Sequence, residues 1–315
     1  MAQPVFDFYD KSCLKSYNLN ETMRYQLNML DKLDVYTRKH CENVASLTCR
    51  LCEYLHCNKG FTEYCTICAY LHDIGKLFIP PAVLQKPGKL TDEEYEIMKT
   101  HTTLGHKMCM SDLKLRPYAA GALYHHEALN GSGYPQGLTK KDIPYEGQII
   151  RVADEYDAIV SKRQYKSHIG ITDTLKILIE NSKPREEINQ SDALAIMAEN
   201  TKMGKNNPII VRTLFKVVID DIEYEISCTC DYVDELYKEL KRFQEIYKYK
   251  EKMESAPNEK KKNYYLEGIK MLLKNNETLD NIDQIHEEYQ NAYQTRKKII
   301  DNLYDEIKKI KKLRV

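Results

Sequence analysis

The chain has 315 residues, enough to bury a sizeable core, and its 47 basic and 47 acidic side chains leave no net formal charge. This balance gives no overall reason to bind a nucleic acid polymer or an anionic membrane, so any anionic ligand must be recognised locally. No apolar run approaches the about 20 residues that cross a bilayer, and the N-terminus lacks the basic start and apolar core of a signal peptide, so we expect no membrane span and a cytoplasmic protein.

The elements in chain order are predominantly helical. Residues 1–30 form a lead-in too short to bury a core of its own. From residue 31 apolar residues recur at helical spacing and alternating strand-like runs are nearly absent, so the predicted class is all-α. Thr91 and Glu94 have the spacing of a capping box and predict the start of a helix. Helices are expected at 34–56, 63–77, 92–109, 117–128 and 148–161, with turns at the glycine and proline clusters 78–90 and 130–138.

Ten cysteines without a secretion signal indicate a reducing compartment. Four of them have the spacing of a zinc ribbon, two C-x2-C pairs separated by twelve residues: Cys49, Cys52, Cys65 and Cys68. Around the first pair, however, apolar residues recur every three or four positions, as in a helix, and Cys52 shares that stripe. Because free cysteine is among the most buried residue types, we interpret the four as core residues rather than as a zinc site.

The C-terminal part has a different character. The apolar run in 206–226 predicts a helix with a short strand at its end. Charged helical segments follow at 232–253 and 279–315, and apolar residues in the second keep the spacing of a coiled-coil seam, which Arg296 interrupts. Two arrangements fit this spacing, a helical hairpin within the chain and a homodimer through these helices. The predicted organisation is thus a lead-in at 1–30, a domain at 31–227 and a charged helical region at 228–315.

Histidines and aspartates gather in a series of short motifs. They are His40 in "DVYTRKH", His72 and Asp73 in "LHDIGK", His101 in "MKTH", His125 and His126 in "YHHE", and Asp154 in "RVADEYDA". Mixed imidazole and carboxylate ligands suit iron, manganese or zinc better than magnesium or calcium. Seven donors, one of them a bridging carboxylate, are what two six-coordinate metals need when water or substrate fills the open positions.

The "HDIGK" motif carries further expectations. Neighbouring side chains on a helix diverge by about 100°, so His72 and Asp73 could serve two metals. Lys76 would lie one turn beyond His72 on the same face, where a lysine beside two metals predicts an anionic participant such as phosphate. Gly75 would keep this turn open to a closely approaching ligand.

Taken together, the motifs resemble the HD-GYP domain, the phosphodiesterase branch of the HD superfamily. The resemblance rests on "HDIGK", "KPGKLTDEEYEIMKTH", "HHEALNGSGYPQGL" and "RVADEYDAIVSKRQYK", and it runs from about 31 to 166, more loosely to about 226. It implies an HD-domain helical bundle with a metal centre that hydrolyses cyclic di-GMP to linear pGpG, sometimes on to GMP. Two adjacent metals would present a bridging hydroxide to the phosphate.

Carried over by position, the resemblance implies two sets of metal ligands. The first metal would be held by His40, His72, Asp73 and Asp154, and the second by Asp73, His101, His125 and His126. Asp73 is then the bridge. Some members of the family hold a third metal through a glutamate whose position is Tyr36 here, so we predict two ions. Iron, as Fe²⁺, is the usual choice of the family, and Mn²⁺ would suit the same ligands.

The resemblance also implies roles around the substrate. Lys76 would contact the scissile phosphate, and Arg163 and Lys166 would bind the substrate. Asp157 would orient a metal ligand or Lys76. In the loop 130–138, Gly131 and Gly133 allow backbone conformations closed to other residues, and Tyr134 would offer a flat face beside the metals. Glu127 would accept a hydrogen bond behind the histidines.

Two other functions fit the same motifs. The substrate could be another cyclic dinucleotide such as 3',3'-cyclic GMP-AMP, because base choice depends on pocket walls outside the motifs. The chain could also be a non-catalytic cyclic-dinucleotide sensor that acts through its C-terminal helices. Loss of metal ligands would favour the sensor, and here all of them are present.

Overall fold

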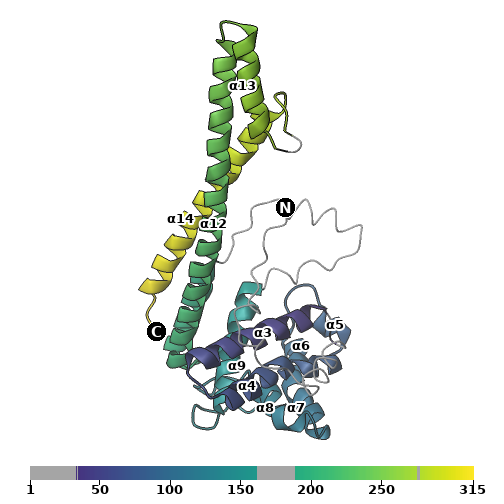
Figure 1. Cartoon of the computed structure of the whole chain (residues 1–315). Coiled ribbons are helices and arrows are strands. Elements are labelled where there is room, and N and C mark those ends of the chain that lie inside the picture. The colour runs from purple at the N-terminus through teal and green to yellow at the C-terminus, as the bar shows by residue number, and fades with distance from the viewer. Residues whose placement is uncertain (1–32, 34, 162–188, 275–276) are drawn as a thin grey trace. The chain divides into compact units, whose positions relative to one another are not determined.

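The computed structural model describes residues 33, 35–161, 189–274 and 277–315 (Figure 1). Within these ranges the regular elements are helices, and the only strand-like pairing is an isolated bridge between Asn130 and Thr139. The predicted all-α class is confirmed. None of the described helices is long and apolar enough to cross a bilayer. The lead-in 1–30 and the predicted substrate residues Arg163 and Lys166 lie outside the described residues.

The chain forms two compact units, the described part of Met1–Ile219 together with Lys309–Val315, and Asp220–Lys308. Their boundary falls within one continuous helix, and the predicted division at 227 and 228 remains our proposal. The helices that lie wholly in the first unit are α3 (Val35–Tyr54), α4 (Lys59–Leu71), η2 (Ile74–Phe78), α5 (Pro81–Leu84), α6 (Asp92–Lys99), α7 (His101–Ser111), η3 (Arg116–Tyr118), α8 (Ala119–Tyr124), α9 (Tyr145–Ser161) and α11 (Gln190–Lys202).

The core of the first unit lies between α3, α4, α8 and α9. Helix α3 packs on α4 and α9, and α8 packs on α4 and α7. Fully buried side chains from these helices include Leu51, Leu71, Ile149 and Ile150. Burying one such side chain stabilises a fold by about 1.5–3 kcal/mol. This packing therefore fixes the positions of the four helices relative to one another.

The four cysteines with ribbon-like spacing lie on two packed helices rather than on turns. Cys49 and Cys52 belong to α3, Cys65 and Cys68 belong to α4, and all four are completely buried. Burial raises the pKa of the Cys49 and Cys68 thiols well above its usual range, so both carry a proton at neutral pH. Among the described residues, the side chains gathered closely enough to share a metal ion are histidines and an aspartate, and no cysteine is among them. The interpretation as core cysteines is confirmed.

Two of the predicted helices are interrupted in the structure. The expected helix 92–109 divides at Thr100 into α6 and α7, and α6 begins at the predicted capping box of Thr91 and Glu94. The expected helix 63–77 ends at Leu71, and a 3₁₀ turn, η2, follows. His72 and Asp73 therefore lie in the junction between two elements, and the expectation that they share an α-helix is wrong. The junction arises because Gly75 packs directly on the backbone of α7.

The second unit is built from three helices. Helix α12 (Pro208–Glu254) begins in the first unit and continues into the second, where it is joined by α13 (Glu259–Leu272) and most of α14 (Ile282–Lys312). The short strand expected near residue 226 is wrong, because Ile222 and Ile226 are buried on α12 at helical spacing. The core of this unit contains Phe243, Ile246, Ile269 and Ile282.

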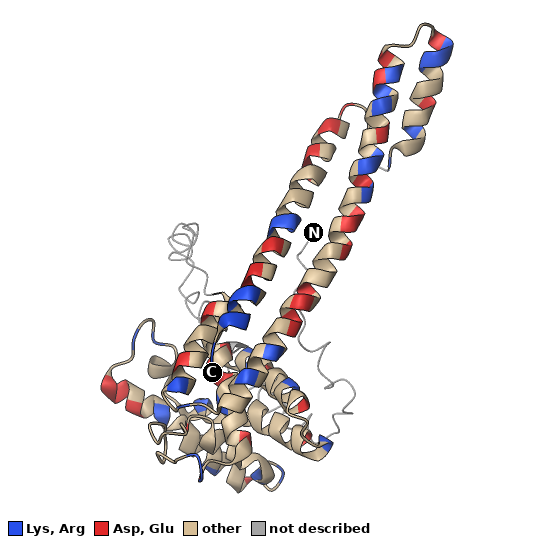
Figure 2. Ribbon diagram, turned by 90° about the vertical axis from the view of Figure 1, so that its left-hand side faces the viewer, with Lys and Arg blue, Asp and Glu red and all other residues tan. Residues whose placement is uncertain are grey.

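Helix α14 folds back along α12 within the second unit. The Phe243 ring lies 5.4 Å from that of Tyr289, and the Tyr237 ring stacks on Tyr293 at 6.2 Å. Arg296, which interrupts the apolar seam, lies over the Tyr232 ring at 5.5 Å. Acidic and basic residues are interspersed along both helices (Figure 2), as on solvated helix faces. The two helices therefore form the hairpin within the chain that the sequence allowed. A homodimer through them stays a prediction.

A half-buried ion pair closes the loop that joins α13 to α14. Arg242 donates to both carboxylate oxygens of Glu277, at 2.6 and 2.7 Å, and to the Leu272 carbonyl at 2.8 Å. The Glu277 side chain is only 7% exposed. The hydrogen bond from Arg242 lowers the pKa of Glu277 below its usual value of 4.5. The stabilisation that the ion pair of Arg242 and Glu277 gives to the folded unit is therefore complete above about pH 4.5. It is lost as the pH falls through the lowered pKa of Glu277.

We expect Glu277→Gln to reduce the stability of the second unit by about 2 kcal/mol at pH 7, since a hydrogen-bonded charge is lost. Hydrogen exchange of the amides in 239–282 would measure this loss. Glu287→Gln, at an exposed position of α14, is the matched control. In thermal unfolding the difference from the wild type should shrink as the pH falls below about 4.5 and Glu277 takes up a proton. Equal protection of the two proteins at pH 7 would contradict this assignment.

Candidate metal centre

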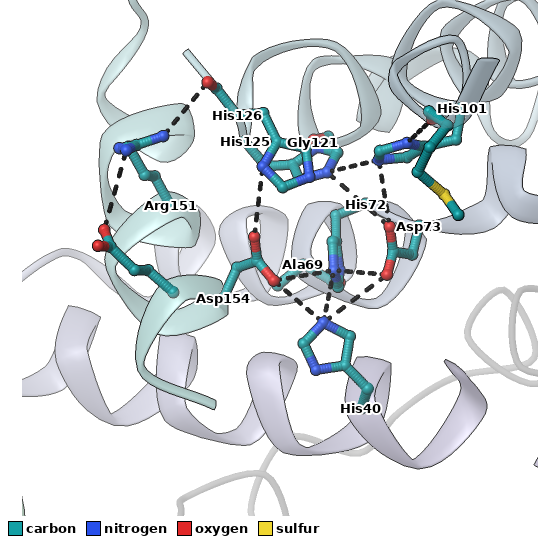
Figure 3. A network of polar contacts seen from close by, with 12 residues as sticks. His40, Ala69, His72, Asp73, His101, Gly121, His125, His126, Arg151 and Asp154 are labelled. Atoms are coloured by element: carbon teal, nitrogen blue, oxygen red, sulfur yellow. Dashed lines mark hydrogen bonds and ion pairs between the residues drawn. The ribbon is translucent and has the colours of Figure 1, made fainter. Parts of the chain in front are cut away.

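The seven predicted metal-binding side chains converge from five places in the first unit (Figure 3). His40 comes from α3, His72 and Asp73 from the junction after α4, His101 from the first position of α7, and Asp154 from α9. His125 and His126 directly follow α8. His72, Asp73, His101 and His125 are at most 1% exposed. The fold thus gathers residues more than a hundred positions apart into one buried polar cluster.

The carboxylate of Asp73 lies between two groups of imidazoles. Its Oδ2 atom is 3.3 Å from His72 Nε2 and 3.7 Å from His40 Nε2. Its Oδ1 atom is 3.3 Å from His101 Nε2 and 3.9 Å from His125 Nε2. One oxygen therefore faces each pair of histidines, which is the arrangement of a bridging ligand.

The carboxylate of Asp154 completes both groups. Its Oδ1 atom is 3.0 Å from His40 Nε2, and its Oδ2 atom is 3.7 Å from His126 Nδ1. Potential ligand atoms of His40, His72 and Asp73 lie within 4.8 Å of one another, and so do those of His101, His125 and His126. Asp154 was expected on the first metal alone, and in the structure its second oxygen also faces His126.

Backbone carbonyls hold the buried histidines in one orientation. The Nδ1 atoms of His72 and His101 each lie 2.6 Å from a carbonyl oxygen, of Ala69 and Met98, and His125 Nδ1 lies 3.0 Å from that of Gly121. A carbonyl only accepts, so each Nδ1 carries the proton and each Nε2 presents a lone pair. Such outer hydrogen bonds are typical of metal-binding histidines.

The resulting lone pairs require a cation. His101 Nε2 and His125 Nε2 are 3.2 Å apart, and two acceptors at this distance cannot hydrogen-bond to each other. Within the described residues, Asp73 Oδ1 is buried and accepts no hydrogen bond. A buried carboxylate oxygen facing two imidazole lone pairs is strongly unfavourable unless positive charge lies between them. The donor set therefore fits divalent metal ions.

The protonation states agree with this arrangement. Burial lowers the pKa of His125 and His126 well below the usual range, assisted by neighbouring imidazoles, so both are neutral at pH 7. Burial alone would raise the pKa of Asp73, but Lys76 and nearby histidines outweigh it and keep the carboxyl ionised. A neutral imidazole and an ionised carboxylate are the forms that bind metals.

His40 is held from outside the cluster by Asp157. Its Nδ1 atom lies 2.6 Å from Asp157 Oδ2, which matches the expected role of Asp157 in orienting a ligand. Burial opposes charge on His40, but the hydrogen bonds to Asp154 and Asp157 raise the pKa of the imidazole to about 10. A metal bound at His40 must therefore displace a proton.

Lys76 and Gly75 contact partners other than those expected. Lys76 lies on η2, not one helical turn beyond His72, and its ammonium donates to Asp73 Oδ2 at 2.5 Å. Gly75 is not open to a ligand, because a Cβ atom there would lie 1.9 Å from the carbonyl oxygen of His101. The absence of a side chain at Gly75 instead lets η2 pack against α7. This contact brings Asp73 beside His101.

Glu127 supports the loop 130–138 rather than the histidines. It is completely buried, and its two carboxylate oxygens accept from the backbone N–H groups of Gln136 and Leu138, at 2.7 and 2.8 Å. The expected acceptor role behind the histidines is therefore corrected. A carboxylate with two N–H donors binds them more strongly than a neutral acceptor would, so Glu127 fixes the shape of this loop.

Tyr134, in the same loop, lies beside the histidine cluster. Its ring stacks on His126, with centroids 4.6 Å apart, which places the expected flat face beside the cluster. Gly131 has a φ of +81°, as expected for a residue closed to most side chains. Gly133 is required for another reason, since a Cβ atom there would lie 2.2 Å from the Ala128 nitrogen.

Arg151 begins the motif "RVADEYDA", but nothing in the sequence assigns it a role beside the histidines. Its guanidinium donates to the His126 carbonyl at 3.2 Å (Figure 3). It also donates to Asn206 at 2.9 Å and lies 3.8 Å from Glu155. The His126 carbonyl also accepts from the Tyr134 N–H. Arg151 lies one turn before Asp154 on α9, which could have suggested proximity, but its partner Asn206 is distant in sequence.

Known proteins similar in sequence to this chain include proteins named as phosphodiesterases of cyclic dinucleotides, as the following matches show. Residues 24–186 match the family model described as HD domain. The chain is 46% identical over 144 residues to a cyclic di-GMP phosphodiesterase of Thermotoga maritima, covering 45% of this chain and 39% of the relative. It is 48% identical over 98 residues to the cyclic di-GMP phosphodiesterase response regulator RpfG of Xanthomonas campestris, covering 30% and 26%.

A further relative is the 3'3'-cGAMP-specific phosphodiesterase 1 of Vibrio cholerae, 32% identical over 151 residues, covering 48% of this chain and 35% of the relative. The matched segment is thus at most about two fifths of each of these relatives. The family model matches more than half of the chain. The chain belongs to the HD domain family, and its GYP loop places it in the HD-GYP branch.

Proposed function

We propose that the chain is a metal-dependent phosphodiesterase that hydrolyses cyclic di-GMP to linear pGpG. The position of Asp73 carries this proposal, because each of its oxygens faces a separate pair of imidazole lone pairs. A bridged pair of metal sites is suited to phosphodiester hydrolysis. The relatives from Thermotoga maritima and Xanthomonas campestris are named for hydrolysis of this dinucleotide.

The site would hold two divalent ions, Fe²⁺ by our expectation and Mn²⁺ as the alternative. One would be bound by His40, His72, Asp73 and Asp154, and the other by Asp73, His101, His125 and His126. When bound, such ions lower the pKa of coordinated water toward about 7 and offset the charge of the phosphodiester. Asp157 would keep His40 in its binding orientation through the 2.6 Å contact with its Nδ1 atom.

Lys76 is the catalytic cation of this proposal. Its ammonium already lies at the Asp73 carboxylate, and the side chain is only 18% exposed. A phosphate entering the site would exchange this contact for one with its own oxygens. Phosphoryl transfer spreads negative charge over these oxygens, and a fixed ammonium in a buried site stabilises it more than water does. Arg163 and Lys166 remain proposed substrate contacts.

One observation favours 3',3'-cyclic GMP-AMP as a second candidate substrate, namely the relative from Vibrio cholerae that is named for it. Both dinucleotides carry a guanine and the same phosphodiester, so the seven ligands do not separate them. Continuation from pGpG to GMP and a homodimer through α12 and α14 are further parts of the proposal. The sensor alternative is disfavoured because all seven candidate ligands are present and lie together in one cluster.

Turnover of the two dinucleotides tests the proposal. The full chain is purified without air, loaded with Fe²⁺ or Mn²⁺, and incubated with each substrate while products are separated chromatographically. We expect pGpG from cyclic di-GMP and none from Asp73→Ala. Faster cleavage of 3',3'-cyclic GMP-AMP would replace the proposed substrate by the second candidate. No cleavage of either dinucleotide by the metal-loaded protein would overturn the enzyme.

A further inference from the structure

A line of aromatic rings leads from the metal centre to helix α6. The His126 and Tyr134 rings stack with centroids 4.6 Å apart, and the Tyr95 ring meets Tyr134 edge to face at 6.4 Å. His126, on which the Tyr134 ring stacks, has its Nδ1 atom 3.7 Å from Asp154 Oδ2. Tyr95, in contrast, is 47% exposed. The line therefore begins at a metal ligand and ends at a ring that a ligand can reach from solvent.

A cation accompanies these two tyrosines. Lys99 Nζ lies 5.3 Å from the centre of the Tyr95 ring and 5.8 Å from that of Tyr134. Its ion-pair partner is Glu96, at 2.5 Å, whose side chain is 69% exposed. Exposed ion pairs contribute little, so Glu96 does not prevent Lys99 from binding a ligand. Nothing in the proposed hydrolysis so far uses Tyr95 or Lys99.

Helix α6 holds both side chains at a set position relative to the metal ligands. Its start is closed by the capping box of Thr91 and Glu94, and Glu94 also accepts from Lys86 at 2.5 Å. The helix ends at Lys99, Thr100 is its C-cap, and the candidate metal ligand His101 follows as the first residue of α7. Sites mounted on capped helices are more precise than sites on free loops.

We propose that Tyr95 and Lys99 form a guanine-binding subsite for the cyclic dinucleotide. The Tyr95 ring would stack on the base, and the Lys99 ammonium would donate to guanine O6 and N7. Guanine presents these two acceptors on one edge, whereas adenine presents an amino donor beside N7, so a lysine selects guanine. Aromatic stacking accepts any base, so specificity resides in Lys99. This inference rests on the proposed function and names the base that the site prefers.

The test compares Lys99→Met and Tyr95→Ala with the wild-type chain. Substrates are cyclic di-GMP, 3',3'-cyclic GMP-AMP, cyclic di-AMP and bis(p-nitrophenyl) phosphate, a phosphodiester without bases. We expect Lys99→Met to lower kcat/KM for cyclic di-GMP about tenfold to a hundredfold, mainly through KM. The loss with cyclic di-AMP and with bis(p-nitrophenyl) phosphate should be at least tenfold smaller. Lys107→Met, at an exposed position of α7, is the matched control.

Tyr95 is tested by a pair of variants. Tyr95→Ala should weaken all three dinucleotides by a similar factor of about ten, because stacking is insensitive to base identity, and Tyr95→Phe should restore them. A change in the guanine preference caused by Tyr95→Ala alone, with Lys99→Met neutral, would contradict the assignment of specificity to Lys99. Equal losses for all four substrates in Lys99→Met would also contradict it, since they would reflect displacement of His101.

Equilibrium binding separates this inference from the proposed function. The Asp73→Asn variant is titrated with cyclic di-GMP and cyclic di-AMP, with and without Lys99→Met, so no turnover is needed. Tighter binding of cyclic di-GMP that is lost with Lys99→Met supports the subsite even if hydrolysis fails. Cleavage of cyclic di-GMP with unchanged KM and base preference in Lys99→Met would overturn the subsite and leave the proposed function intact.

Discussion

Replacing Asp73 with Asn is expected to lower the turnover of cyclic di-GMP by a factor of about a thousand or more. Asparagine keeps the size of the side chain but removes the charge that lies between the two pairs of histidines. Metal ions supply several kcal/mol of transition-state stabilisation, and each 1.36 kcal/mol changes a rate tenfold. The variant should also bind fewer than two metals per chain. The measurements are kcat/KM together with metal content.

Two comparisons make this expectation specific. Asp157→Asn, which alters only the support of His40, should cost about tenfold to a hundredfold. Asp192→Asn, at an exposed position of α11, should behave as the wild type. If Asp73→Asn retained both metals and wild-type turnover, the carboxylate would not be the bridge, and the assignment of two adjoining metal sites would have to be abandoned.

Lys76→Met should reduce kcat about a hundredfold to a thousandfold while the metal content stays at the wild-type level. The ammonium lies at the Asp73 carboxylate but is not itself a ligand, and bound metal ions would keep that carboxylate ionised without it. Its loss therefore removes positive charge mainly from the phosphate site. Removing one fixed donor from a site where charge develops typically has this effect. The experiment measures kcat and KM separately, with metal content determined on the same sample.

The kcat of Lys76→Met would be compared with that of a variant that retains the charge. Lys76→Arg keeps the positive charge with a bulkier head group, so it should recover part of the lost kcat. A threefold or smaller decrease of kcat in Lys76→Met would show that Lys76 only offsets the charge of Asp73 in the metal-free protein. Loss of metals in Lys76→Met would likewise contradict a role confined to the phosphate.

The convergence of the seven candidate metal ligands was predictable because each belongs to a short motif. His72 with Asp73, and His125 with His126, are recognisable from neighbouring residues alone, and the structure brings all seven side chains together. The capping box at Thr91 was equally local. Helical class followed from apolar spacing. In each of these cases the information lies within a few positions of the chain, where sequence patterns are informative.

The parts that escaped prediction depend on packing and hydrogen bonds that local sequence patterns do not encode. Periodicity did not reveal the end of α4 at Leu71, which depends on how Gly75 packs against the α7 backbone. The partner of Glu127 is the loop that follows it, and Arg151 reaches the His126 carbonyl only because α9 lies beside α8. The apolar spacing of 206–226 suited a helix throughout, and the strand was an unnecessary addition.

Counting the metal ions bound to each chain tests the account most directly. The full chain is purified without air, saturated with Fe²⁺ or Mn²⁺, freed of excess ion, and analysed for metal and protein in the same sample. We predict two ions per chain, falling to one or fewer in Asp73→Asn. A wild-type content of one ion or less, under conditions that saturate the protein, would contradict the binuclear centre formed by these seven side chains.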